Sequence, residues 1–139
     1  MSDPQLALDT SAAVPLLVAS HEAHRAVATW AGGRPLCLSG HALAETYAVL
    51  TRLPGDARVS AADAVQLIDE NFPTILLLPA DHALGLHREL SRHGVVGGAT
   101  YDGLMALTAR EHGATLVSRD ARACFTYERL GVAVLTLAS

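Results

Sequence analysis

The stretch "QLALDTSAAVPLL" (residues 5–17) decides how this chain folds, because a short apolar run is interrupted by one acid before a second apolar run begins. The first run is typical of a buried β-strand and the second of a helix. A charge at the point where a buried strand gives way to a helix is costly unless it has a partner. Asp9 is therefore the first candidate for a functional residue.

The alternation of strand and helix continues along the chain. Short β-rich runs predict five strands, at 6–9, 35–38, 74–78, 115–117 and 132–136. Helices are predicted to begin near Ser11, Ser20, His41, Ser60, Pro79, Thr100 and Asp120. This alternation is typical of an α/β fold with a mostly parallel sheet that is covered on both faces.

The length and composition of the chain indicate one globular domain. Half of the 139 residues are hydrophobic, which is enough to build a core, so residues 1–139 are expected to form a single domain. No basic cluster precedes the first apolar run, and Asp9 and Thr10 interrupt that run. We therefore expect neither a signal peptide nor a membrane span, and a cytoplasmic location.

The charged residues and cysteines exclude several classes of site. The net charge of −4 argues against a broad basic surface that holds nucleic acid by phosphate contacts alone. All ten basic residues are arginine, so the chain has no lysine for a Walker P-loop or for Schiff-base chemistry. Cys37 and Cys124 stand far apart and show no CxxC spacing, which predicts core thiols.

Four acids occupy related positions in the predicted alternation. Asp9 ends the first strand, and Glu45 lies one turn into the helix after the second strand. Asp102 lies in the first turn of the helix near Thr100, and Asp120 follows the fourth strand. Ligands of an open parallel sheet bind beyond the carboxyl ends of its strands. We therefore expect the four carboxylates to converge at one edge of the sheet.

Each acid taken singly also has a structural interpretation. Asp9 and Asp120 are good N-cap residues for the helices that follow them. Asp102 is favoured in a first turn by the helix dipole. Glu45 fits a structural role least, because its helix neighbours are apolar and an unpaired carboxylate among them would be costly.

Convergence of the four acids would require a cation. Two carboxylates about 5 Å apart repel each other by roughly 3 kcal/mol at an effective dielectric constant of about 20. Protonation or a divalent cation relieves such repulsion, and oxygen-only ligands favour Mg²⁺. A magnesium ion with open coordination positions accepts a phosphate and a water, which suits hydrolysis by in-line displacement.

Four stretches of the chain resemble a known family, the PIN-domain ribonucleases, and most closely the VapC toxins of bacterial toxin–antitoxin pairs. They are "LALDTSAAVPLL" (6–17), "AETYAVLTRLP" (44–54), "GGATYDGLMALTAREHGATLVSRDARA" (97–123) and "TYERLGVAVL" (126–135). The likeness covers nearly the whole chain. The order of the four acids at these spacings carries it, since any one acid would be weak support.

The resemblance implies a three-layer α/β/α sandwich that forms a homodimer and cleaves RNA. It implies that Asp9 and Asp102 bind Mg²⁺ or Mn²⁺, while Glu45 and Asp120 complete the acidic metal site and orient metal-bound water. The implied partner is a VapB-type antitoxin whose tail covers the site, and the implied substrate is RNA, often transfer or ribosomal RNA. No membrane partner is implied.

Two positions around Asp120 bear on this comparison. Ser118 falls where the family usually has a small hydroxyl residue. Ala123 stands where many relatives have a further acid, so a fifth ligand is not expected from that position.

The resulting hypothesis is a magnesium-dependent endoribonuclease toxin, and two rival interpretations remain open. One is a catalytically silent binding module that keeps the same fold. The other is an aspartate-dependent phosphohydrolase, although such sites usually have a second acid two residues on, or a lysine, and here that position is Ser11.

Several further residues have both a functional and a structural interpretation. Arg52, Arg119 and Arg122 either hold RNA phosphates by forked hydrogen bonds or are solvated surface arginines. Tyr47 and Tyr101 either stack on bases or pack at the rim of the core. The loop "GVVGGAT" (94–100) either presents N–H groups to a phosphate or acts as a hinge, and the scattered histidines predict no metal site.

Overall fold

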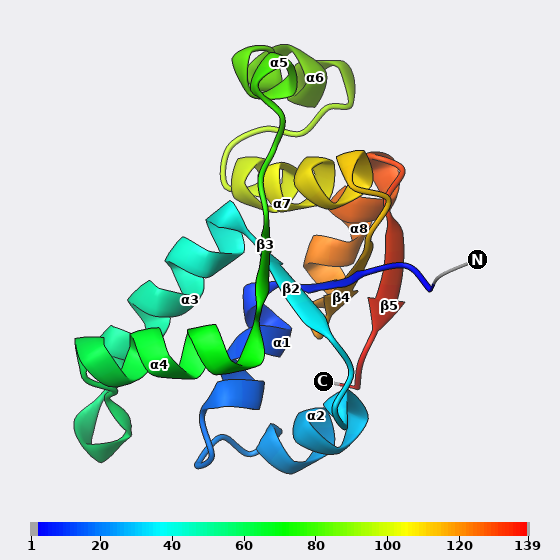
Figure 1. Ribbon diagram of the computed structural model, residues 1–139. Coiled ribbons are helices and arrows are strands. Elements are labelled where there is room, and N and C mark those ends of the chain that lie inside the picture. Colours follow the sequence, from blue (N-terminus) through cyan, green and yellow to red (C-terminus); the bar gives the residue numbers. More distant parts are fainter. Residues whose placement is uncertain (1–2, 139) are drawn as a thin grey trace.

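The computed structural model of the chain describes residues 3–138, and a five-stranded sheet with helices on both faces forms its centre (Figure 1). The strands are β1 (Leu6–Leu8), β2 (Leu36–Ser39), β3 (Thr74–Leu76), β4 (Thr115–Ser118) and β5 (Ala133–Thr136). Their order is β3-β2-β1-β4-β5, and every neighbouring pair is parallel. The predicted α/β fold is confirmed, with a sheet that is parallel throughout rather than mostly so.

Six of the seven predicted helix starts agree with the structure to within one residue. The helices are α1 (Thr10–Leu17), α2 (His24–Ala31), α3 (Gly40–Arg52), the 3₁₀ helix η1 (Gly55–Ala57), α4 (Ala61–Asn71), α5 (Ala80–Leu84), α6 (Leu86–Arg92), α7 (Ala99–Glu111) and α8 (Ala121–Arg129). None of the helices within residues 3–138 is both long and apolar enough to cross a membrane.

The predictions around Ser20 and Pro79 need correction. The helix expected near Ser20 is α2, which begins only at His24, because the backbone first forms turns with His21 N–H bonded to Val18 C=O. The segment after Pro79 forms two short helices, α5 and α6, which meet at Gly85. Figure 1 shows these two helices at one end of the molecule, beyond α7.

Two strands end earlier than predicted, for identifiable reasons. β1 ends at Leu8 because Asp9 already caps the next helix. β3 ends at Leu76 rather than at 78, because its neighbour β2 makes its last pairing there, between Ser39 and Leu76. An edge strand has no other neighbour in the sheet with which it could continue a ladder.

Both faces of the sheet are buried against helices, which explains the continuous apolar runs in the sequence. Successive strand residues point to opposite faces, so each strand supplies both cores. Ala7, Cys37 and Leu116 pack with residues of α6, α7 and α8, whereas Leu8, Leu38 and Val117 pack with residues of α1, α3 and α4. Cys37 and Cys124 are both buried free thiols, as predicted.

The strand order places Asp9 at the centre of the sheet edge. The chain runs from β1 to β2 and β3 on one side and then crosses to β4 and β5 on the other. The end of β1 is therefore the point at which the strand order reverses, where ligands of such sheets bind. The backbone N–H of Asp9 donates to Val117 C=O at 2.9 Å, which fixes this turn against β4.

Candidate functional site

Asp9 is buried, with an exposed fraction of 2%, and both of its carboxylate oxygens accept hydrogen bonds. Oδ1 accepts from Ser11 Oγ at 2.5 Å and from the Ala12 backbone N–H at 3.2 Å, which caps α1. Oδ2 accepts from the Tyr127 hydroxyl at 2.8 Å. Asp9 is thus confirmed as the N-cap of α1, but capping uses only Oδ1, and Oδ2 bonds to a different helix.

Tyr127 is a part of the site that the sequence analysis missed. It lies on α8, is fully buried, and stands 118 positions from the acid to which it donates. Burial, followed by the charge of Asp9, raises the pKa of Tyr127 well above its usual value. The hydroxyl therefore remains protonated and fixes the orientation of the Asp9 carboxylate. No local sequence signal marks so distant a pairing.

Two serines connect the turn after β1 to the turn after β4. Ser11 Oγ accepts from the Arg119 backbone N–H at 2.8 Å and lies 3.4 Å from Ser118 Oγ. Ser118 is fully buried, and its Oγ accepts from the Asp120 backbone N–H at 3.0 Å. This network holds the segments that carry Asp9 and Asp120 side by side. The "DTS" spacing in the sequence was the available signal for Ser11.

Asp120 is exposed and caps α8. Its Oδ1 accepts from the backbone N–H groups of Arg122 at 2.9 Å and Ala123 at 3.2 Å. Ala123 itself is buried, so the position where many relatives have another acid here belongs to the core. The N-cap prediction for Asp120 is confirmed.

Asp102 lies in the first turn of α7, within electrostatic reach of the three other predicted acids. Its pKa is raised from 3.8 to about 6, first by burial and then by the charges of Asp120, Asp9 and Glu45. A nearby histidine, His41, opposes the shift. All three other acids therefore act on this carboxyl group. Convergence of four separate segments at one edge of the sheet agrees with the expectation from strand order.

Glu45 lies at the rim of this group, not among apolar side chains as its sequence neighbours suggested. Its side chain is 39% exposed, and its Oε2 lies 3.3 Å from His41 Nε2. Residues 41 and 45 share one face of α3, whereas buried Ala42 and Leu50 lie on other faces. The argument that burial makes Glu45 costly was therefore wrong. The i,i+4 spacing to His41 was the signal for this contact.

The chemistry of the donor set fits a hard divalent cation. Four carboxylates supply only oxygen ligands, and the pKa of Asp102 is raised first by burial and then by the charges of the other three acids, which a cation would offset. Within residues 3–138, however, no three His, Cys, Asp or Glu side chains stand close enough together to form a ligand shell as they are. Cation binding would therefore require some of these side chains to change rotamer. Asp120, which is exposed, and Glu45, which is 39% exposed, have the most room to do so.

The arginines and tyrosines that the sequence offered as RNA contacts lie in different environments. Arg119 is engaged with the backbone, since its Nε donates to Ala138 C=O at 3.2 Å and its Nη1 to Ser11 C=O at 3.4 Å. Arg52 and Arg122 are exposed. Tyr47 lines an apolar groove of about 300 Å³ between α3 and α4, whereas Tyr101 adjoins Asp102.

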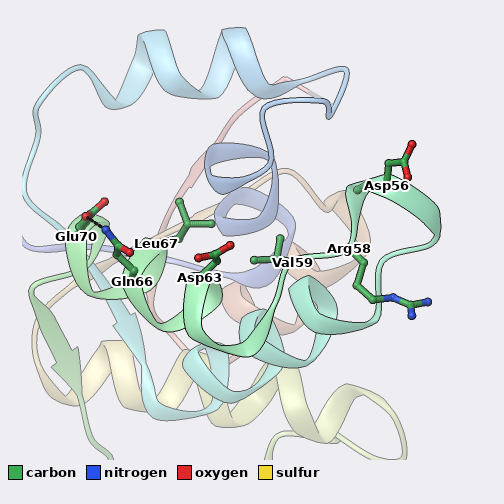
Figure 2. Close-up of a pocket in the computed structure, with 8 residues that line it drawn as sticks. Asp56, Arg58, Val59, Asp63, Gln66, Leu67 and Glu70 are labelled. Carbon is green, nitrogen blue, oxygen red and sulfur yellow. Dashed lines mark hydrogen bonds between the residues drawn. The ribbon is translucent and has the colours of Figure 1, made fainter.

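A second groove contains acids but is distinct from this group. A hollow of about 410 Å³ lies beside η1 and α4, and Gln66 Nε2 donates to Glu70 Oε1 at 2.9 Å in its lining. Figure 2 shows the residues that line it. Asp56, Arg58 and Asp63 also line it. None of the four predicted site acids lines this hollow.

The fold and the acid group together define a PIN domain, and comparison with known proteins agrees. The PIN-domain family model matches residues 6–128. The chain belongs to the VapC ribonucleases of the PIN-domain family, the toxins of toxin–antitoxin modules. It is 53% identical to the ribonuclease VapC27 of Mycobacterium tuberculosis over 135 residues, which are 97% of this chain and 98% of that relative.

Solved structures show the same fold at lower identity. A FitAB complex bound to a DNA fragment superposes with a TM-score of 0.74 at 23% identity, over 95% of this chain and 94% of that one. Mycobacterium tuberculosis VapC20, described as a toxin that cleaves the sarcin–ricin loop, gives a TM-score of 0.68 at 21% identity, over 87% of this chain and 94% of that one.

Proposed function

We propose that this ribonuclease hydrolyses RNA phosphodiester bonds at the four-carboxylate group, with Mg²⁺ as the physiological cation and Mn²⁺ as a substitute. Asp9 and Asp102 would hold the cation, and Glu45 and Asp120 would complete the site. The observation that supports this assignment best is the pKa of Asp102, which burial and the three other acids raise to about 6. A divalent cation is the natural partner for that charge.

The residues of the chain divide the work of the site. Tyr127 and Ser11 fix the two oxygens of Asp9, as second-sphere partners fix metal ligands in other proteins. If the four carboxylates held a divalent cation, it would supply polarisation of the phosphate and a lower pKa for a bound water. Glu45 lies at the open rim, where a carboxylate is placed to accept a proton from water.

The structure argues against the phosphohydrolase interpretation. Oδ2 of Asp9 accepts one hydrogen bond and retains a lone pair for a cation, but Asp9 is buried, with an exposed fraction of 2%, which disfavours its direct attack on a substrate phosphorus. The position two residues on, where such enzymes have a second acid, is Ser11, which donates to Asp9. Asp9 thus has the environment of an oriented ligand rather than of a nucleophile.

We further propose a VapB-type antitoxin as the partner, a homodimer as the assembly and a cytoplasmic location. Support for the antitoxin comes from the FitAB and VapBC structures, toxin–antitoxin complexes in which the same fold occurs. Structured RNA, such as transfer or ribosomal RNA, is the proposed substrate class, in line with the description of VapC20. Light scattering of the purified chain measures its oligomeric state. Co-purification after co-expression with a reading frame adjacent to its gene tests for the antitoxin.

The proposed site is tested by RNA cleavage with three proteins. Wild type should cleave a total RNA preparation in Mg²⁺ and lose that activity in excess EDTA. Asp102→Asn should remain folded but inactive, because it removes a charged ligand without adding bulk. Asp69→Asn is the matched control, since Asp69 is exposed on α4 and should tolerate the same change with full activity.

Calorimetric titration with Mn²⁺ separates the remaining interpretations. Wild type should bind Mn²⁺ and Asp102→Asn should bind it far more weakly. A wild-type chain that neither cleaves RNA nor binds Mn²⁺ would indicate a silent binding module. Undiminished cleavage in EDTA, or by Asp102→Asn, would refute the carboxylate site.

A further inference from the structure

Two rings form a stack at the rim of the acidic group. His41 on α3 and Tyr101 on α7 lie with their ring centroids 5.3 Å apart and their planes inclined by 14°. Tyr101 is 57% exposed, whereas the His41 side chain is only 21% exposed. His41 therefore supports one face of the tyrosine ring from within, and much of the tyrosine remains open to solvent.

The stack is held in place from the protein side. His41 Nε2 lies 3.3 Å from Glu45 Oε2, one turn further along α3. Tyr101 is in the first part of α7, and residues 99–111 of that helix pack on α3 and on the sheet. An exposed ring that is supported in this way loses little conformational freedom when a flat ligand stacks on it.

We propose that the open face of Tyr101 stacks on a nucleobase of the RNA strand, next to the phosphate that is cleaved. This inference rests on the proposed function, and it assigns that site a base-binding position. Aromatic side chains are the usual platforms for unpaired RNA bases, and they accept bases largely without regard to sequence. The ligand class is thus a single-stranded or looped-out nucleotide.

The negative charge of the site favours binding of RNA through a stacked base over binding through its phosphates. Four carboxylates and a net charge of −4 disfavour RNA phosphates until a cation is present. Arg119 is occupied with backbone carbonyl groups, which leaves only Arg52 and Arg122 of the three candidate arginines exposed against four carboxylates. The uncharged ring of Tyr101 can therefore contribute affinity for RNA that the charges around the site do not provide.

The position of the stack places a bound base beside the acids. His41 stacks on Tyr101 and its Nε2 lies 3.3 Å from Glu45 Oε2. The charge of His41 also opposes the rise in the pKa of Asp102, so the stack lies close to both acids. These two acids come from the same two helices as the two rings. A nucleotide whose base rests on Tyr101 would therefore be aligned with the group that acts on its phosphate.

A protein partner fits this stack less well than a base does. The surroundings are charged, since Glu45 Oε2 lies 3.3 Å from His41 Nε2 and the charge of His41 acts on Asp102. The other exposed tyrosine, Tyr47, differs because it lies with Leu43 and Val65 in the apolar groove between α3 and α4. That groove has the character of a protein-binding surface, and it provides a matched control for the stack.

The test uses a short RNA strand that contains a single 2-aminopurine, whose fluorescence is quenched when the base stacks. Binding is measured with Ca²⁺ in place of Mg²⁺ for wild type, Tyr101→Phe, Tyr101→Ala and the control Tyr47→Ala. Quenching should occur with wild type and Tyr101→Phe. Tyr101→Ala should lose the quenching and bind the strand about 5- to 150-fold more weakly, the range expected for one stacked base. Tyr47→Ala should bind within about twofold of wild type.

The outcomes separate this inference from the function on which it rests. If wild type cleaves RNA in Mg²⁺ but Tyr101→Ala keeps both quenching and affinity, the base-binding position is overturned and the nuclease assignment stands. If wild type neither binds nor cleaves RNA, the proposed function itself fails. If Tyr101→Ala weakens only the complex with a protein partner, the stack is a protein contact and the inference is overturned. Because Tyr101 is exposed, its replacement should leave thermal unfolding unchanged, which checks folding.

Discussion

Replacing Asp102 by asparagine should stabilise the metal-free protein. Burial first, and then the charges of Asp120, Asp9 and Glu45, raise the pKa of Asp102 from 3.8 to about 6. A carboxyl group whose pKa is higher in the folded state than in the unfolded state favours folding while it is protonated. That contribution is fully present below pH 3.8 and is lost as the pH rises through about 6.

The size of the effect follows from the shift. Each pKa unit corresponds to about 1.4 kcal/mol, so the ionised group costs at most about 3 kcal/mol of stability above pH 7 and about 1.5 kcal/mol at pH 5. Asparagine carries no charge and avoids most of this cost. Asp102→Asn should therefore raise the melting temperature at pH 7.5 in EDTA by several degrees, and by much less at pH 4.

The measurement is thermal unfolding of both proteins from pH 4 to pH 8, in EDTA and in Mg²⁺. Mg²⁺ should stabilise wild type more than Asp102→Asn, because a ligand that binds only the folded state adds to stability. Asp69→Asn, on the exposed side of α4, should show neither the pH dependence nor the gain. Equal or lower stability of Asp102→Asn at pH 7.5 in EDTA would refute the reasoning that burial and the three other acids make the ionised Asp102 costly.

Two substitutions and one labelling experiment test the environment of individual residues. Tyr127→Phe should lower the free energy of unfolding by about 1–3 kcal/mol in urea titrations, because the buried Asp9 loses its partner on Oδ2; unchanged stability would show that this bond contributes nothing. Ser60→Ala should cost about 1 kcal/mol, since Ser60 Oγ caps α4 by accepting from Asp63 N–H at 3.1 Å. Burial raises the pKa of Cys37 above its ordinary value, so at pH 8 a thiol reagent should label this buried residue only after unfolding, and rapid labelling of the native protein would contradict the described packing.

Much of the fold followed from local patterns in the sequence. The runs around 36–38 and 115–117 predicted strands because both faces of the sheet are buried, which makes such strands apolar throughout. The helix starts followed from capping chemistry, as at Asp9 and Asp120, where one side chain accepts from backbone N–H groups two or three residues on. The start of α2 was misplaced because no side-chain cap marks it and successive turns at residues 18–24 precede it.

Only part of the candidate site could be predicted from local sequence patterns. Parallel strands place their carboxyl ends at one edge, so the convergence of Asp9, Glu45, Asp102 and Asp120 could be predicted from the order of elements. The sequence did not reveal that Glu45 lies at an open rim. That depends on which face of α3 packs against its neighbours, and apolar residues lie close to Glu45 in sequence on more than one face.

By itself, the sequence determined the alternation of strands and helices, the parallel sheet and the order of the four acids, because these depend on side-chain periodicity and on local capping bonds. Only the tertiary structure decided that Tyr127 donates to Asp9 and that His41 stacks on Tyr101. These pairs join segments that are 118 and 60 positions apart, and such contacts exist only after the helices have packed on the sheet. No periodicity within a short segment can encode them.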